Sequence, residues 1–244
     1  MQLSSNLKHL YDNYYSDGKI DLQTKRDLTA IQSVRNFKNL FPGKRFNKLL
    51  DIGAGDGNTL SILSQENLSD ELSAIEISIS GINKIKGKAI KNLVKVELFD
   101  GYKIMEESST FDIGIALHVL EHVEHERVFI SEIARVCKYI YIEVPLEGTF
   151  FIEKAILVSS KYGHINFYQA STLKALMESC NLKVLRFNVF SHSKEYEILL
   201  NGYLSGTLRY FIKKLFLNLF PRLATFFFTY TCGIVVTNNQ KIDN

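Results

Sequence analysis

A glycine-rich turn directly after a short apolar run limits the folds open to this chain more than any other feature. The stretch KLLDIGAGDGNTL covers residues 48–60, and Gly53, Gly55 and Gly57 occupy alternate positions in it. Backbone without a Cβ lets a ligand approach closely. A helix that begins at about Asn58 would direct its free N–H groups to the same point. The stretch therefore predicts a strand, a turn and a helix around a bound ligand.

Three later apolar segments end in acidic residues, glycine or histidine. The segments are 72–77, 93–99 and 111–117, and the residues at their ends are Glu76, Asp100, Gly101 and His118. Parallel strands bring their carboxyl ends to one edge of a sheet, and ligands bind in the crevice outside that edge. The pattern predicts an α/β fold with such a crevice, in which Glu76 accepts hydrogen bonds from a ribose.

The spacing of the glycines distinguishes between nucleotide-like ligands. Gly53-Ala54-Gly55-Asp56-Gly57 is one residue shorter than the dinucleotide fingerprint, and its aspartate would repel a pyrophosphate. The acids near the predicted crevice, which are Asp51, Asp56, Glu76 and Asp100, give it negative potential. An adenosine that carries a cationic sulfonium fits this pattern better than a dinucleotide.

At this point the chain resembles the class I S-adenosylmethionine-dependent methyltransferases. The matching stretches span about residues 48–185 and are LLDIGAGDG, LSAIEIS, LFDG, FDIGIALHVLEHV, YIYIEVP and GHINFYQASTLKALMESCNLKVL. The resemblance implies a Rossmann-like, doubly wound α/β fold with seven strands, mostly parallel, and an antiparallel last strand. It also implies S-adenosylmethionine as the cofactor.

The same resemblance implies a role for individual residues. The glycine turn would approach the methionine part of the cofactor, Glu76 would hold the ribose, and Asp100 would face the adenine amino group. The predicted cofactor-binding residues are Asp51, Gly53, Ala54, Gly55, Gly57, Glu76, Ile77, Asp100, Gly101 and Leu117.

The chain divides into three predicted parts. These are an N-terminal helical cap (1–42), a methyltransferase core (43–190), and a C-terminal part (191–244) with a basic apolar helix and a final strand. The cap reads as two helices, and its Tyr14 and Tyr15 either close over the cofactor or pack in the interior. The last two strands are expected at 182–190 and 226–237.

The stretch HVLEH carries the groups most able to do chemistry. If a helix covers 118–136, His118, Glu121 and His122 lie on one face, and His164 of GHINFY joins them. In one interpretation all four bind a divalent metal. The pattern is similar to the Glu-x-x-Glu-His helix of small-RNA 2′-O-methyltransferases and of some ubiquinone-pathway enzymes, and the extra imidazole favours Zn²⁺, Fe²⁺ or Mn²⁺ over Mg²⁺.

Two other interpretations of the histidines stay open. In the second, His122, His164 or His118 is a catalytic general base that takes a proton from an attacking hydroxyl. In the third, Glu121 and His122 are structural. The order His-x-x-Glu-His also occurs in inverted zinc peptidases, but here it directly follows a buried strand behind a glycine-rich crevice, which disfavours that class.

The acceptor is predicted from weaker signals. GHINFY and PRLATFFFTY are similar to methyltransferases found with polysaccharide-assembly enzymes, which implies O-methylation of a small molecule, a sugar or a lipid-linked glycan. A quinone-like phenol, a carboxylate or an RNA 2′-hydroxyl is the alternative. Lys and Arg are not concentrated in the sheet-edge loops, which disfavours nucleic acid. A cofactor-binding interaction module without activity is the non-enzymatic alternative.

The segment 203–237 contains Arg209, Lys213, Lys214 and Arg222 but no acid, beside many apolar residues. A basic amphipathic helix at 203–226 either makes peripheral contact with a membrane or packs against the sheet or a second subunit of a homodimer. A net charge of +3 does not itself indicate nucleic acid. Three widely spaced cysteines and a polar N-terminus favour the cytoplasm, including the inner face of its membrane.

Overall fold

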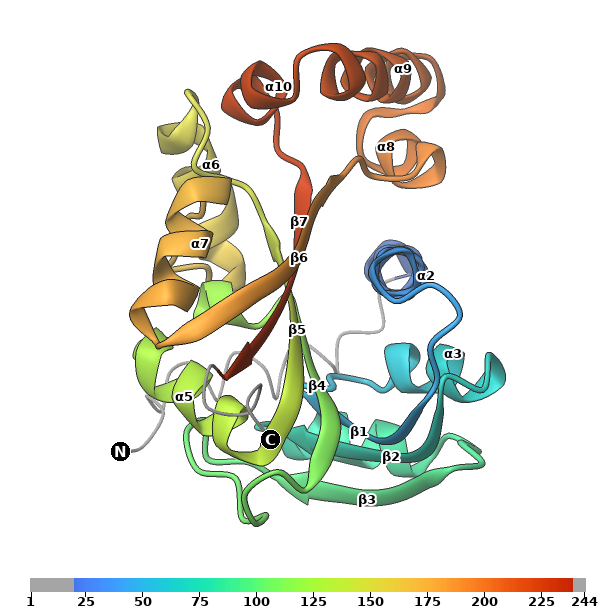
Figure 1. Cartoon of the computed structure of the whole chain (residues 1–244). Helices are drawn as coiled ribbons and strands as arrows, with labels where there is room; N and C mark the ends of the chain where they lie inside the picture. The colour runs from blue at the N-terminus through green and yellow to red at the C-terminus, as the bar shows by residue number, and fades with distance from the viewer. Residues whose placement is uncertain (1–19, 239–244) are drawn as a thin grey trace.

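The computed structural model describes residues 20–238, which form one seven-stranded sheet with helices on both faces (Figure 1). The strands lie in the order β3-β2-β1-β4-β5-β7-β6. Their bounds are β1 Phe46–Ile52, β2 Ser69–Glu76, β3 Leu93–Leu98, β4 Phe111–Leu117, β5 Cys137–Pro145, β6 Leu182–Phe190 and β7 Thr231–Asn238. Strands β1 to β5 pair in parallel, as the alternation of strands and helices predicts.

The helices alternate with these strands and then continue as a group of three. Their bounds are α2 Ile20–Leu40, α3 Asn58–Gln65, α4 Ile79–Lys86, η1 Leu120–His122, α5 Glu126–Val136, α6 Ile152–Ser159, η2 Ser160–Tyr162, α7 Ala170–Ser179, α8 Lys194–Asn201, α9 Tyr203–Leu219 and α10 Pro221–Phe227. Helices α8, α9 and α10 lie together at one end of the molecule, away from β3 (Figure 1). Among residues 20–238, no helix combines the length and apolar character needed to span a bilayer.

Strand β7 is antiparallel to both of its neighbours, which confirms the predicted antiparallel last strand. It lies between β5 and β6, with Tyr139 opposite Thr237 on one side and Phe190 opposite Thr231 on the other. The strand itself starts five residues later than predicted from 226–237, because α10 continues to Phe227 and a short connection precedes Thr231.

Two apolar cores lie on the two faces of the sheet, since neighbouring strand residues point to opposite sides. One core contains Phe129 of α5 and Met177 of α7, and the other contains Phe37 of α2 and Leu60 of α3. Both faces of the central strands are therefore covered, which is typical of a parallel sheet.

One predicted helix needs correction, and another lies outside the residues that the structure describes. The helix expected over 118–136 is broken: only the short 3₁₀ turn η1 follows β4, and α5 starts at Glu126. The second predicted helix of the cap corresponds to α2. Its first helix, with Tyr14 and Tyr15, falls outside the described residues.

Candidate functional site

A cavity of about 560 Å³ lies at the carboxyl edge of β1 and β4. One end is lined by the glycine turn, with Gly53, Ala54 and Gly55, and the wall continues past Leu117 and His118. Helices α2, α6, α8 and α9 supply the other walls. The cavity is thus placed where a ligand is expected in an open parallel sheet.

The glycine turn has the backbone that its sequence predicts. Gly53 and Gly57 adopt positive φ angles of 74° and 78°, a region that side chains disfavour. A Cβ on Gly53 would lie 2.6 Å from a methyl group of Val119, so a larger residue would also push η1 away. Helix α3 begins directly after Gly57, at Asn58.

Glu76 at the end of β2 is bonded to the glycine turn. Its Oε2 accepts a hydrogen bond of 2.8 Å from the Gly55 amide, and its Oε1 accepts from the Ser78 amide and hydroxyl. The side chain is 2% exposed, and burial raises its pKa against the lowering effect of these bonds. Glu76 therefore holds the turn in place, and its role toward a ribose stays a prediction.

The negative potential predicted for the crevice is smaller than the count of acids suggests. Burial, with the charge of Glu76, raises the pKa of Asp51 to about 8, so this residue is mostly neutral at pH 7. The carboxylate of Asp56 lies 3.3 Å from Nε of Arg26, which offsets its charge. Asp100 retains an exposed carboxylate, which accepts hydrogen bonds from the amides of Tyr102 and Lys103.

The predicted cofactor residues divide into two groups. Those that line the cavity are Gly53, Ala54, Gly55 and Leu117; those outside its lining are Asp51, Gly57, Glu76, Ile77, Asp100 and Gly101. The second group lies in or just after β1, β2 and β3, so its members border the same sheet edge. The glycine turn exposes backbone without side chains, and the Glu76 carboxylate lies beside it. This arrangement fits an adenosyl cofactor with a methionine part.

His118 is not on a helix face as the sequence analysis assumed. It has a φ of 55° and lies between two carboxylates, 3.4 Å from Glu121 and 3.4 Å from Glu143. Burial alone would lower its pKa, but these contacts raise it to about 10. His118 is therefore an imidazolium at neutral pH, which disfavours both its predicted roles, as base and as metal ligand.

Glu143, the second partner of His118, ties α2 to the sheet. It is fully buried and accepts hydrogen bonds from Ser33 and Asn36 of α2 and from Tyr141 of β5. Burial would raise its pKa, but the bonds to these groups and the His118 cation keep it below its usual value. This network explains why a carboxylate is tolerated in the core.

His164 forms a dyad with a residue that the sequence analysis did not identify. Its Nδ1 lies 2.8 Å from Glu147 Oε2, and the other oxygen of Glu147 accepts a 2.7 Å hydrogen bond from Ser159. The carboxylate makes Nδ1 the donor, which leaves Nε2 as an acceptor in the cavity wall. Glu147 comes two residues after the end of β5, at the sheet edge that carries the other site residues.

His122 lies against His164, with ring centroids 4.7 Å apart. Burial lowers the pKa of His122, so its imidazole is neutral at pH 7. Ligand atoms of Glu121, His122 and His164 lie within 4.8 Å of one another, which is compatible with three of the four predicted metal ligands. Glu147 would orient His164 for such a metal, because it holds Nδ1 and leaves Nε2 to coordinate, while the ion would share the Glu121 carboxylate with His118.

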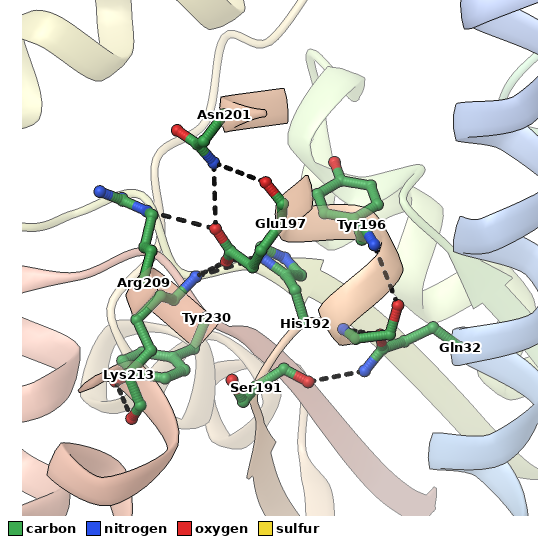
Figure 2. Close-up of polar contacts among 10 residues, drawn as sticks. Gln32, Ser191, His192, Tyr196, Glu197, Asn201, Arg209, Lys213 and Tyr230 are labelled. Carbon is green, nitrogen blue, oxygen red and sulfur yellow. Dashed lines mark hydrogen bonds and ion pairs between the residues drawn. The ribbon is translucent and has the colours of Figure 1, made fainter. Parts of the chain in front are cut away.

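The far end of the cavity is built by α8 and α9 and was not predicted as part of the site (Figure 2). Glu197 is its centre: Lys213 donates a hydrogen bond of 2.5 Å, and Arg209 Nε and Asn201 Nδ2 lie 3.2 and 3.3 Å away. His192 Nδ1 lies 3.4 Å from the same carboxylate. We call this group the Glu197 cluster.

Comparison with known proteins identifies related sequences. A family model described as a methyltransferase domain matches residues 22–186. Norajmaline N-methyltransferase of Rauvolfia serpentina is 28% identical in an alignment of 138 residues that covers 52% of this chain. That match covers 47% of the relative, so the chain spans about half the length of this curated relative.

Solved structures share the fold at low sequence identity. A chain from the complex between the Haloferax volcanii Trm112 methyltransferase activator and a methyltransferase has a TM-score of 0.68 at 13% identity, covering 93% of this chain and 96% of that one. Haemonchus contortus phosphoethanolamine N-methyltransferase 2, solved with phosphomonomethylethanolamine and S-adenosylhomocysteine, has a TM-score of 0.61 at 15% identity. That alignment covers 85% of this chain and 52% of the other.

Proposed function

The chain belongs to the methyltransferase domain family, within the class I S-adenosylmethionine-dependent methyltransferases, and from this premise we propose that it O-methylates a small molecule, in particular a sugar or lipid-linked glycan hydroxyl. The observation that carries the proposal is the His164–Glu147 dyad. It lies in the wall of the same cavity that reaches the glycine turn. A hydroxyl acceptor requires such a base, because it must lose its proton as it attacks.

Different residues bind the cofactor and accept the proton in the proposed reaction. When bound, the cofactor supplies a sulfonium-activated methyl group, held by the glycine turn and Glu76. The chain must then align the acceptor and exclude water. His164 Nε2 accepts the hydroxyl proton, and Glu147 stabilises the imidazolium that forms.

The polar character of the α8–α9 end supports a hydroxyl-rich acceptor. Tyr196 and Arg209 line this end and offer hydrogen-bond donors to an acceptor, whereas the amide nitrogen of Asn201 already donates to Glu197. Val158 and Leu200, which also line the cavity, are more than half exposed at its rim. Polar side chains within the cavity and apolar side chains at its rim suit a glycolipid acceptor.

An amine is the second candidate acceptor, because the curated relative is named as an N-methyltransferase. The dyad would also take the proton of an ammonium group. A quinone-like phenol and an RNA 2′-hydroxyl remain alternatives with a metal held by Glu121, His122 and His164. In that case chelation removes turnover, whereas the dyad alone predicts turnover that survives dialysis against EDTA.

The test measures S-adenosylhomocysteine release with panels of sugar nucleotides, isoprenoid-linked glycans, phenols and amines. We expect turnover with hydroxyl acceptors and binding of the cofactor by calorimetry. Cofactor binding together with turnover on amines alone would reject O-methylation. Cofactor binding without turnover on any acceptor would favour the cofactor-binding interaction module, and an absence of cofactor binding would reject methyl transfer.

A further inference from the structure

Helix α9 is an amphipathic helix packed the opposite way from a surface helix of a globular protein. A surface helix normally turns its apolar stripe to the core. In α9 the buried residues are Gly206 and Lys213. The apolar side chains spaced three and four residues apart are all exposed by 57% or more, and they are Leu204, Leu208, Phe211, Leu215 and Leu219.

The inward face of α9 is fixed by close contacts with α8 and with the segment before β7. Gly206 packs on α8 so closely that a Cβ would lie 2.4 Å from the carbonyl oxygen of Glu197. Lys213 lies in the Glu197 cluster, and its own carbonyl accepts a 2.7 Å hydrogen bond from Tyr230 of the segment before β7 (Figure 2). The apolar stripe therefore faces outward by construction.

Helices α10 and α6 extend this apolar stripe. On α10, Leu223, Phe226 and Phe227 are exposed by 41 to 51%, and the adjoining Phe150 and Phe151 before α6 by more than half. The amide of Phe150 donates to the carbonyl of Phe226 at 2.8 Å, and the rings of these two residues lie 5.5 Å apart. We call the exposed residues of the three helices the α6–α9–α10 surface. Contiguous apolar patches of this kind mark interaction sites.

The charge of this surface is predominantly positive. Lys154, Lys161, Lys214 and Arg222 are exposed on or beside the three helices, against the single acid Glu153. A two-fold interface between copies of this chain would place like charges opposite each other, whereas a layer of anionic headgroups complements all four. Basic residues contribute most to the free energy of membrane binding where the membrane carries anionic lipid.

We propose that the α6–α9–α10 surface docks on an anionic lipid bilayer as a peripheral membrane contact. The apolar stripe inserts among the acyl chains while the four cations contact lipid phosphates. Val158 of α6 and Arg209 of α9 belong both to these helices and to the cavity wall, and Tyr162 of η2, directly after α6, lines the cavity beside them. The consequence for the substrate rests on the proposed function: an acceptor of lipid-linked type would reach the cavity from the bilayer.

The first test is co-sedimentation of the full chain with phosphatidylcholine vesicles, with or without phosphatidylglycerol, and without methyl donor. We expect binding to the anionic vesicles only, weakened by salt. Lys214→Glu with Arg222→Glu should reduce that binding at least about tenfold, given the usual gain per basic residue at an anionic surface. Lys86→Glu with Lys91→Glu makes the same change in net charge on the exposed surface near β3 and should leave binding intact.

A second pair of variants tests the apolar stripe. Leu215→Ser with Leu219→Ser should weaken vesicle binding, while Val94→Ser with Met105→Ser, which changes equally exposed apolar residues elsewhere, should not. Sedimentation velocity is measured for all forms. The proposal would be overturned if the chain did not bind anionic vesicles, or if the control variants lost as much vesicle binding as the surface variants. It would also be overturned if the chain formed a dimer that Leu215→Ser with Leu219→Ser dissociates. Because no donor or acceptor is present, these outcomes are independent of methyl transfer.

Discussion

Nζ of Lys213 on α9 lies 2.5 Å from a carboxylate oxygen of Glu197 on α8, and both side chains are 3% exposed or less. Burial lowers the pKa of Lys213, and the Glu197 charge opposes that shift. The pair holds α9 with its apolar stripe outward and also completes one end of the cavity. Its loss should therefore affect stability and the acceptor site together.

Lys213→Met should lower the free energy of unfolding by about 3 kcal/mol, because it removes one partner of a buried ion pair. Arg209 and Asn201 still contact Glu197, which limits the cost to the lower end of the usual range. Urea unfolding measures the change. Lys214→Met, at the next and exposed position, is the control and should stay within about 0.5 kcal/mol. Similar stability of the two variants would contradict a structural role for the pair.

Stability should fall in acid through Glu197. Burial would raise its pKa, but His192 and Lys213 lower it from 4.5 to about 2. A carboxyl with a depressed folded-state pKa contributes fully above pH 4.5 and loses that contribution as pH falls toward 2, a change of about 3 kcal/mol. Unfolding of the wild type and of Glu197→Gln at a series of pH values checks this. Between pH 4.5 and 2 the free energy of unfolding should depend less on pH in the variant than in the wild type. Parallel curves would contradict this role of Glu197.

His164→Ala should lower kcat by about 10² to 10⁴, with cofactor affinity unchanged. Glu147→Gln should also lower kcat, because the imidazolium formed in the reaction loses its compensating charge. His125→Ala, an exposed histidine outside the cavity, is the matched control. Added imidazole should restore part of the turnover of His164→Ala, a rescue that a purely structural histidine would not show.

Glu76→Ala should abolish measurable cofactor binding, whereas Glu76→Gln should retain part of it. The amide oxygen of glutamine can still accept a hydrogen bond from Gly55, so the turn keeps its position. Titration calorimetry with S-adenosylhomocysteine compares the two, and circular dichroism confirms the fold. If Glu76→Ala binds as tightly as the wild type, the carboxylate has no role in the cofactor site.

Much of the fold follows from local sequence signals. The strand Phe111–Leu117 matches its predicted bounds, and α3 begins at Asn58 as the glycine turn predicts. These features depend on neighbouring residues, so a sequence pattern is enough to find them. The start of β7 was misplaced because an apolar, aromatic run such as residues 226–230 is compatible with either helix or strand.

The site was harder to predict because its properties depend on residues distant in sequence. The pKa of His118 is raised by Glu121, three positions away, and also by Glu143, 25 positions away, which only the fold brings beside it. Glu147 acquires its partner His164 only through the fold. Periodicity also shows which residues of α9 share a face, but the outward direction of that face is set by Gly206 and Lys213 against α8.

The antiparallel insertion of β7 has a consequence for synthesis. Strands β1 to β4 can assemble as the nascent chain emerges, but β5 keeps a bare edge until Thr231–Asn238 has been translated. Tyr139 pairs with Thr237 across nearly 100 residues of intervening chain. Such a long-range closure is slow and leaves an unpaired strand open to misassembly. This half of the sheet is therefore the part most open to misassembly while the chain is being synthesised.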